Sequence, residues 1–382
     1  MAILTGLSGN EMFCLSLKGL KPGELVIGNS VHSLGFLGGI GAGFQVVFGG
    51  EVQQITDIIS EGRHEAQTRL EQEAIKHGAQ AITGVTSELR TMQGNTEFLS
   101  VGSCAHGAAT DASAIWGKAG SAVVSTNGGG QQLYCMLDAG YAPKRMVMGN
   151  VAYSVGVAGG LLGTLKSLAR GEIREFSDIF NKTRHLALQR ITKEARAVGA
   201  NAVVSIETRI MPFKGVHEML MLGTAASHPA LPADAANNPV TSDLTAEEMW
   251  NLAAMGYMPL KLVLGTAVYS LGLIGGFKAA FKSFARGEIS DLTTLIYDAR
   301  EHAIGLVRAE AEAIGADDVV GIRTHIHEIG NLIEFMAIGT AVKKLPGAKP
   351  VTDALPPQAI IRDKETWITE SDYAYAAISS GE

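Results

Sequence analysis

Two histidines and a glutamate stand together in the segment HIHE, at residues 325–328. If this segment is a strand, His325 and His327 point to the same side, because side chains alternate between the two faces of a strand. Two imidazoles beside a carboxylate could bind a divalent metal ion. The same positions of two related segments, described below, carry no histidine. We therefore expect no cofactor, with a metal ion at His325 and His327 as the alternative.

The stretch LGFLGGIGAGFQVVFGG, at residues 34–50, resembles three different features. Its glycines could cradle a phosphate, but a phosphate loop needs glycines at fixed positions before a helix. The corresponding stretches, GGLLGTL and GGFKAAF, keep only the first pair of glycines. The longer apolar stretch from Leu25 to Phe48 reaches the length of a membrane span, yet it includes Asn29, Ser30 and His32. We expect a bend and a short helix packed at an interface, where glycine permits close backbone approach.

Charged residues return at constant spacing along the chain. One arginine and two glutamates recur three times, and such residues could serve as an acid–base pair. No serine, cysteine or histidine that could act as a nucleophile recurs beside them, so we favour ion pairs that fix a helix on a sheet or a subunit on its neighbour. The recurring positions are Arg63, Arg184 and Arg300; Glu73, Glu194 and Glu310; and Glu97, Glu218 and Glu334.

These residues belong to three tandem repeats. The segment ELVIGNSVHSLGFLGG returns as RMVMGNVAYSVGVAGG and KLVLGTAVYSLGLIGG, so that Gly28, Gly149 and Gly265 are separated by 121 and then 116 residues. The same two spacings hold for the recurring charges. We expect the following organisation: repeats over 10–106, 131–227 and 247–343, surface connectors over 107–130 and 228–246, and an extended tail over 344–382.

Composition limits the class of protein. The chain has 382 residues and a net charge of −7, with 46% hydrophobic and only 18% charged residues, and its lysines and arginines form no basic patch. We expect no nucleic-acid partner, and the polar residues of the apolar stretches argue against a membrane span. The start has no secretory signal, and the three cysteines lack paired spacing. We expect a cytoplasmic protein.

Each repeat has the pattern of an α+β unit. A short leader helix precedes a strand that begins near LVIG, followed by a helix over about 53–77 and two strands joined by a tight turn. One helix covers one face of a small sheet, whereas the last strand, MLMLG in the second repeat, is apolar on both faces. The repeats must therefore pack on one another or on other chains.

The segments GNSVHSLG, FGGEVQQITDI, REHAIGLVRAEAEAIGADDVVGI and FMAIGTAV resemble the YbjQ-type family, whose members carry a heavy-metal-binding label. The resemblance covers about three quarters of the chain, once per repeat. It implies dodecin-like β-α-β-β subunits that assemble into rings, commonly pentamers, and it supplies no catalytic residues. Typical members contain a single unit, so a chain of three is a departure.

Together, the repeats and the resemblance predict a bacterial, non-enzymatic protein that forms a homo-oligomeric ring or a larger shell. Three fused repeats could occupy three stacked rings or successive positions of one ring. The most apolar segments, 34–48, 155–165 and 271–281, are expected at interfaces or along an interior surface. The alternatives are a metal- or small-ligand-binding oligomer with sites between repeats, and a membrane-associated assembly.

Overall fold

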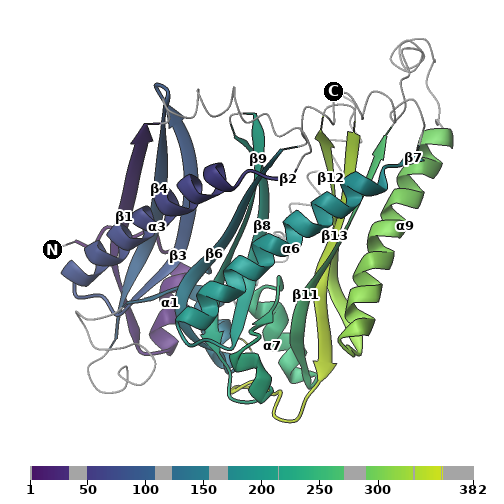
Figure 1. The fold of residues 1–382 in the computed structure, drawn as a ribbon. Coiled ribbons are helices and arrows are strands. Elements are labelled where there is room, and N and C mark those ends of the chain that lie inside the picture. The colour runs from purple at the N-terminus through teal and green to yellow at the C-terminus, as the bar shows by residue number, and fades with distance from the viewer. Residues whose placement is uncertain are drawn as a thin grey trace, which may run out of the picture. The chain divides into compact units, whose positions relative to one another are not determined.

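The three repeats are folded alike in the computed structural model (Figure 1). Each contains a nine-residue helix, a long strand, a 24-residue helix and a two-stranded hairpin, which confirms the expected β-α-β-β unit with its leader helix. The structure describes residues 2–33, 50–107, 123–154, 171–213, 215–270, 290–329, 332–353 and 355. The repeats lie in one unit that extends to Val351.

The helices and strands of the repeats, with four two-residue strands between them, have the following bounds. The first repeat comprises α1 (Gly9–Leu17), β1 (Leu20–Ser33), β2 (Gly50–Glu51), α3 (Gln53–Lys76), β3 (Ala81–Met92) and β4 (Asn95–Gly107). The second comprises β5 (Val124–Ser125), α4 (Gly130–Asp138), β6 (Ala142–Ser154), β7 (Gly171–Glu172), α6 (Arg174–Ala197), β8 (Ala202–Phe213) and β9 (Val216–Ser227). The third comprises η1 (Ala233–Ala236), β10 (Val240–Thr241), α7 (Ala246–Ala254), β11 (Tyr257–Ser270), α9 (Ser290–Ala313), β12 (Asp318–Ile329) and β13 (Leu332–Lys344).

Local sequence signals explain the ends of these elements. Ser8 caps α1, and Glu11 returns a hydrogen bond to it in a capping box. Each long helix ends at a glycine with positive φ, as expected: Gly78, Gly199 and Gly315. The first strand of each repeat begins earlier than we expected, at Leu20 rather than near Leu25 in the first repeat. Its proline is tolerated because the register shifts between Pro22 and Leu25.

Each hairpin pairs antiparallel with the first strand of its repeat, and short strands of neighbouring repeats extend the sheet. The sheet orders are β1-β4-β3-β5, β10-β8-β9-β6-β2 and β12-β13-β11-β7. Thus β2, which precedes the long helix of the first repeat, pairs with β6 of the second, and β7 pairs with β11 of the third. In the other direction, β5 adds to β3 and β10 adds to β8.

The connectors differ from the surface segments that we expected. The described end of the first connector includes β5, which is buried and pairs in parallel with Ala81 and Ile82. Strand β3 has a bulge next to this pairing, at Gly84, where a positive φ turns backbone N–H groups of β3 away from β4. Those groups donate instead to the connector, as Val85 N does to Thr126 O at 2.9 Å. The second connector repeats this contact at Ile206 and Ser242.

The recurring glycine of the first strand allows helix and sheet to touch. A Cβ on Gly28 would lie 2.0 Å from the carbonyl oxygen of Ala66 in α3, and a Cβ on Gly149 would lie 2.1 Å from that of Ala187. Gly265 stands equally close to α9, at 2.3 Å from Ala303 O. Only glycine fits at this crossing, which accounts for its return in every repeat.

Candidate functional site

The contact between successive repeats brings together buried apolar side chains and buried ion pairs. Helix α6 lies between its own sheet and the sheet of the third repeat, and it contacts β6, β9 and β11. Strand β9 is buried on both faces: Met219 and Met221 pack toward α6, whereas Leu220 and Leu222 pack with Leu70 of α3. The doubly apolar strand is therefore covered by the preceding repeat, as the sequence required.

An arginine from the long helix of one repeat reaches a glutamate on the last strand of the next. Arg63 donates through Nε and Nη2 to the two carboxylate oxygens of Glu218, at 3.0 and 2.7 Å. Arg184 binds Glu334 in the same manner, with a shortest distance of 2.6 Å. All four side chains are almost fully buried. This geometry satisfies both charges, and it fixes the register of the helix on the neighbouring sheet.

An aromatic ring supports the second of these ion pairs. The Arg184 guanidinium lies 4.3 Å from the centre of the Tyr153 ring and donates to the Tyr153 hydroxyl at 2.8 Å. Burial disfavours the charged guanidinium, but the Glu334 carboxylate beside it raises the pKa of Arg184. The Arg184 guanidinium therefore stays charged inside the junction.

The second set of recurring glutamates binds the exposed edge of the first strand. Glu73 accepts from the backbone N–H of Ile27 at 2.6 Å, and Glu194 accepts from that of Met148 at 2.9 Å. Glu310 repeats the contact with Leu264 at 3.1 Å. These carboxylates satisfy backbone donors that the sheet leaves unpaired at its edge.

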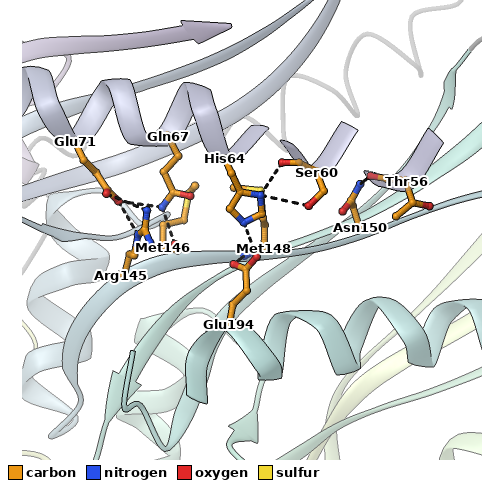
Figure 2. A network of polar contacts seen from close by, with 10 residues as sticks. All are labelled: Thr56, Ser60, His64, Gln67, Glu71, Arg145, Met146, Met148, Asn150 and Glu194. Carbon is orange, nitrogen blue, oxygen red and sulfur yellow. Dashed lines mark hydrogen bonds and ion pairs between the residues drawn. The ribbon is translucent and has the colours of Figure 1, made fainter. Parts of the chain in front are cut away.

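Figure 2 shows how the same glutamate joins two repeats. His64 of α3 contacts Glu194 of α6 through Nε2 at 2.5 Å, while its Nδ1 contacts Ser60 O at 2.6 Å. Glu71 of α3 accepts from Arg145 of β6 at 2.9 and 3.0 Å. At the second junction, His185 contacts Glu310 at 3.2 Å. Both junctions therefore join a histidine of one helix to a glutamate of the next.

These contacts shift the pKa values of His64, His185 and Glu310. Hydrogen bonding to Glu194 raises the pKa of His64 in spite of burial, and hydrogen bonding to Glu310 raises that of His185. Burial alone would raise the pKa of Glu310. Hydrogen bonds from His185, from Lys261 and from the Leu264 backbone outweigh burial and lower the pKa of Glu310 to about 2. The junctions favour cationic His64 and His185, and the second junction favours an anionic Glu310.

The last arginine and the first glutamate of the recurring sets differ from their counterparts in their contacts. Arg300 is exposed and forms no ion pair with another described residue, whereas Arg63 and Arg184 are fully buried. Glu97 accepts only from the Asn29 side chain at 3.3 Å among the described residues. Among the described residues, Arg300 and Glu97 therefore take no part in an ion pair like those of the two internal junctions.

The two histidines that we considered for metal binding share one face of β12. Their rings stack with centres 6.2 Å apart, and burial lowers the pKa of both imidazoles. No group of three metal-binding side chains occurs among the described residues, so this pair lacks a third ligand there. The three cysteines are buried and unpaired.

Some junction residues escaped the sequence reasoning. The hydroxyl of Thr56 accepts from the Ala152 backbone at 2.9 Å, and that of Ser177 accepts from Val268 at 2.9 Å. A hydroxyl at the first turn of each long helix, with Thr293 third, was the available signal. The glycine-rich stretch and its counterparts lie outside the described residues, as do the aromatic residues of the tail. Among the described helices, none is long and apolar enough to cross a membrane.

Comparison with known proteins matches each repeat to one family. The YbjQ family model, described as "Putative heavy-metal-binding", matches residues 20–112, 141–228 and 255–344, which is well over half of the chain. The leader helices lie before the matched ranges.

Similar curated proteins divide into longer and shorter relatives. An "Encapsulin nanocompartment protein" of Mycobacterium tuberculosis is 31% identical over 225 residues, covering 56% of this chain and 83% of that protein. A "UPF0145 protein" of Pseudothermotoga lettingae is 45% identical over 85 residues, covering 22% of this chain and 80% of that protein. Another, from Thermosipho melanesiensis, is 41% identical over 86 residues, with 22% and 80% covered. The chain belongs to the YbjQ family, with three tandem copies of the family domain.

Proposed function

We propose that the protein is a non-enzymatic structural subunit that associates with copies of itself into a shell-like assembly. The observation that carries this proposal is the unequal burial of equivalent strands. Eight consecutive residues of β6 are buried, from Met146 to Tyr153, because α3 of the preceding repeat covers its outer face. In β1, which has no preceding repeat, buried and exposed residues alternate. An apolar strand face left open in this way calls for a partner.

The relative from Mycobacterium tuberculosis supports the shell. It is named an encapsulin nanocompartment protein, and this chain matches most of its length. A nanocompartment is a closed shell of repeated subunits, so a related chain with open repeat faces is suited to the same role. A shell also implies an interior in which cargo could be held.

The absence of catalysis is part of the proposal. Arg63 and Arg184 use their guanidinium groups in buried ion pairs, and Glu310 accepts from His185, Lys261 and a backbone N–H. Charged groups held in this way position backbone and sheet, and they leave no activated group facing a substrate. We therefore assign the recurring charges to assembly.

The way in which the repeats are fused favours one kind of ring. Both internal junctions use the same contact between helix and sheet, so the repeats take successive positions along one series rather than positions in stacked rings. If whole chains close such a series, the number of repeats in the ring is a multiple of three. A ring of five repeats, which the resemblance implied, cannot then be built, whereas rings of two or more whole chains can.

Native mass spectrometry of the untagged protein, followed by electron microscopy, tests the proposal. We expect a discrete multiple of 40.1 kDa and closed particles. A monomer at micromolar concentration would overturn the structural role. Extra mass in a fixed ratio to the chain, lost on chelation and absent from a His325→Ala, His327→Ala variant, would replace it with metal binding.

A further inference from the structure

Each end of the repeat series presents one half of the internal junction. At the junctions inside the chain, the long helix and the first hairpin strand of one repeat face the outer surface of the next repeat's sheet. The first repeat keeps such a surface uncovered, here called the head face, made by β1 and β4. The third repeat keeps the complementary surface uncovered, here called the tail face, made by α9 and β12.

We propose that the tail face of one copy binds the head face of a second copy, in a third version of the internal junction. This inference rests on the proposed self-assembly and names the surface and the residues that carry it. The contact is heterologous, so it closes into a ring or continues as an open series.

Apolar burial on the head face is the first support. Leu25, Ile27 and Val31 of β1 are 41%, 50% and 59% exposed. Their counterparts in the other two repeats, 121 and then a further 116 residues along, are 0–2% exposed beneath the helix of the preceding repeat. These counterparts are Met146, Met148 and Ala152 of β6, and Leu262, Leu264 and Val268 of β11. A second copy's α9 would cover the head face in the same manner.

The tail face shows the matching difference. Ile322 of β12 is 44% exposed, whereas its counterparts Val85 and Ile206 are each 2% exposed inside the chain. Tyr297 of α9 is 61% exposed. Its counterpart Asn181 binds the backbone of Thr266 in the following repeat. The residues that would touch a following repeat are therefore the ones left in solvent.

Charges on the two faces are complementary. The series of ion pairs, Arg63 with Glu218 and Arg184 with Glu334, continues with Arg300 on the tail face and Glu97 on the head face. A second pair changes sign between junctions. At the first junction the helix position is Glu71 and the strand position is Arg145, and the two form an ion pair; at the second junction these positions are Thr192 and Lys261. At the ends of the chain, the helix position is Arg308 and the strand position is Glu24.

The backbone of the amino-terminal segment also fits the tail face. The two-residue strands β5 and β10 pair in parallel with β3 and β8 of the preceding repeat. Their counterpart in the first repeat is Ile3–Leu4, and both side chains are exposed, at 50% and 80%. In the second copy this segment would add to β12 at Asp318 and Val319, where the parallel strand is missing. Sheet and side-chain contacts thus agree on one orientation.

Two variants that each lose one face test the contact. Val31→Asp places a charge on the head face, and Ile322→Asp places one on the tail face. Both residues are exposed in the single chain, so both variants should fold with unchanged circular dichroism. Each is expected to be monomeric, with association weakened on the order of a hundredfold or more, because a buried carboxylate would lack a partner.

The oligomeric state of a mixture of these two variants tests whether the two faces bind each other. Val31→Asp keeps an intact tail face and Ile322→Asp keeps an intact head face, so an equimolar mixture should form a two-chain complex and grow no further. The matched control is Val351→Asp, at an exposed valine whose backbone binds the middle repeat through Asp138 O, and it should assemble like the natural chain. A mixture that stays monomeric would overturn the proposed contact.

Charge exchange tests the ion pair itself. Arg300→Glu alone should weaken association on the order of a hundredfold, and adding Glu97→Arg in the same chain should restore most of it. If the natural chain assembles and all these variants assemble equally well, the head-to-tail contact is wrong while the proposed function stands. If the natural chain is itself monomeric, both are overturned.

Discussion

Strands β1 and β6 are the same element of neighbouring repeats, yet only β6 is covered on both faces. Met148 and Ile27 occupy one position of the two repeats, next to the recurring glycine. Met148 is buried beneath α3, whereas Ile27 faces solvent. The two residues are similarly apolar, so the difference arises from what precedes each repeat rather than from the strand itself.

The comparison shows that a repeat of this chain does not complete its own core. Each repeat buries one face of its sheet with its own helix and leaves the other face to the helix of the preceding repeat. In the fused chain, the sheets of the second and third repeats are covered in this way at the two junctions. The outer face of the first repeat's sheet stays uncovered. Tandem repeats commonly share this need for a partner, since each buries apolar surface only by stacking on a neighbour.

The largest expected effect concerns the buried ion pairs. Arg184→Ala should lower the free energy of unfolding by about 3–5 kcal/mol, because Glu334 would remain as a buried charge without its partner. Arg300→Ala, at the equivalent exposed position, should change it by no more than about 0.5 kcal/mol. Urea titrations at concentrations where the chain is monomeric measure both values. Equal losses for the two variants would contradict the difference between internal and terminal faces.

Apolar truncation separates the same two regions with a smaller expected effect. Leu264→Ala removes a β11 side chain that is buried against α6, and it should lower the free energy of unfolding by about 2–5 kcal/mol. Ile27→Ala, at the equivalent position of β1, should lie within about 0.5 kcal/mol in the monomer. The same titrations measure both variants. A large loss from Ile27→Ala would mean that the head face is covered within the chain.

Much of this architecture could be predicted from the sequence. Constant spacing located the three repeats, and the glycines after the long helices marked their ends. The run MLMLG indicated a strand buried on both faces, which β9 confirms. The family resemblance was confirmed for every repeat.

The remainder depended on contacts between distant residues. Strands β2, β5, β7 and β10 contain two residues each, too few to produce a hydrophobic period. Recurrence of an arginine and a glutamate suggested that they pair, but it could not say whether Arg63 binds Glu97 of its own repeat or Glu218 of the next. That choice depends on the packing of the helix between two sheets.

Changes in pH should act on the internal junctions through their histidines. The pKa of His185 is raised in the folded chain, so its contribution is complete below the unfolded value, about 6.5, and is lost as pH rises through the folded value. The contribution of Glu310 is present above its unfolded value and is lost as pH falls toward about 2.

His185→Gln should therefore reduce the loss of stability between about pH 6 and pH 9. Unfolding followed across this range measures the slope for the variant and for the natural chain. His302→Gln is the control, because this histidine contacts Glu172 rather than the Glu310 junction. Identical slopes for His185→Gln and the natural chain would show that the contact with Glu310 does not titrate in this range.

The smallest expected effect lies at Glu301, where the terminal faces depart from the histidine–glutamate contact of the internal junctions. His64 and His185 meet glutamates of the following repeat, whereas the third residue of this series is Glu301. In the proposed contact, Glu301 would face Glu73 of the second copy, and two carboxylates repel.

Glu301→His should restore the internal pattern and strengthen association by up to about 1 kcal/mol, since this position is exposed in the single chain. Glu301→Ala removes the charge without adding a hydrogen bond, and it should give a smaller gain. Mass photometry over a range of concentrations would rank the natural chain, Glu301→Ala and Glu301→His in increasing order of association. The reverse order would place Glu301 away from Glu73, and it would require the second copy to bind in another register along the head face.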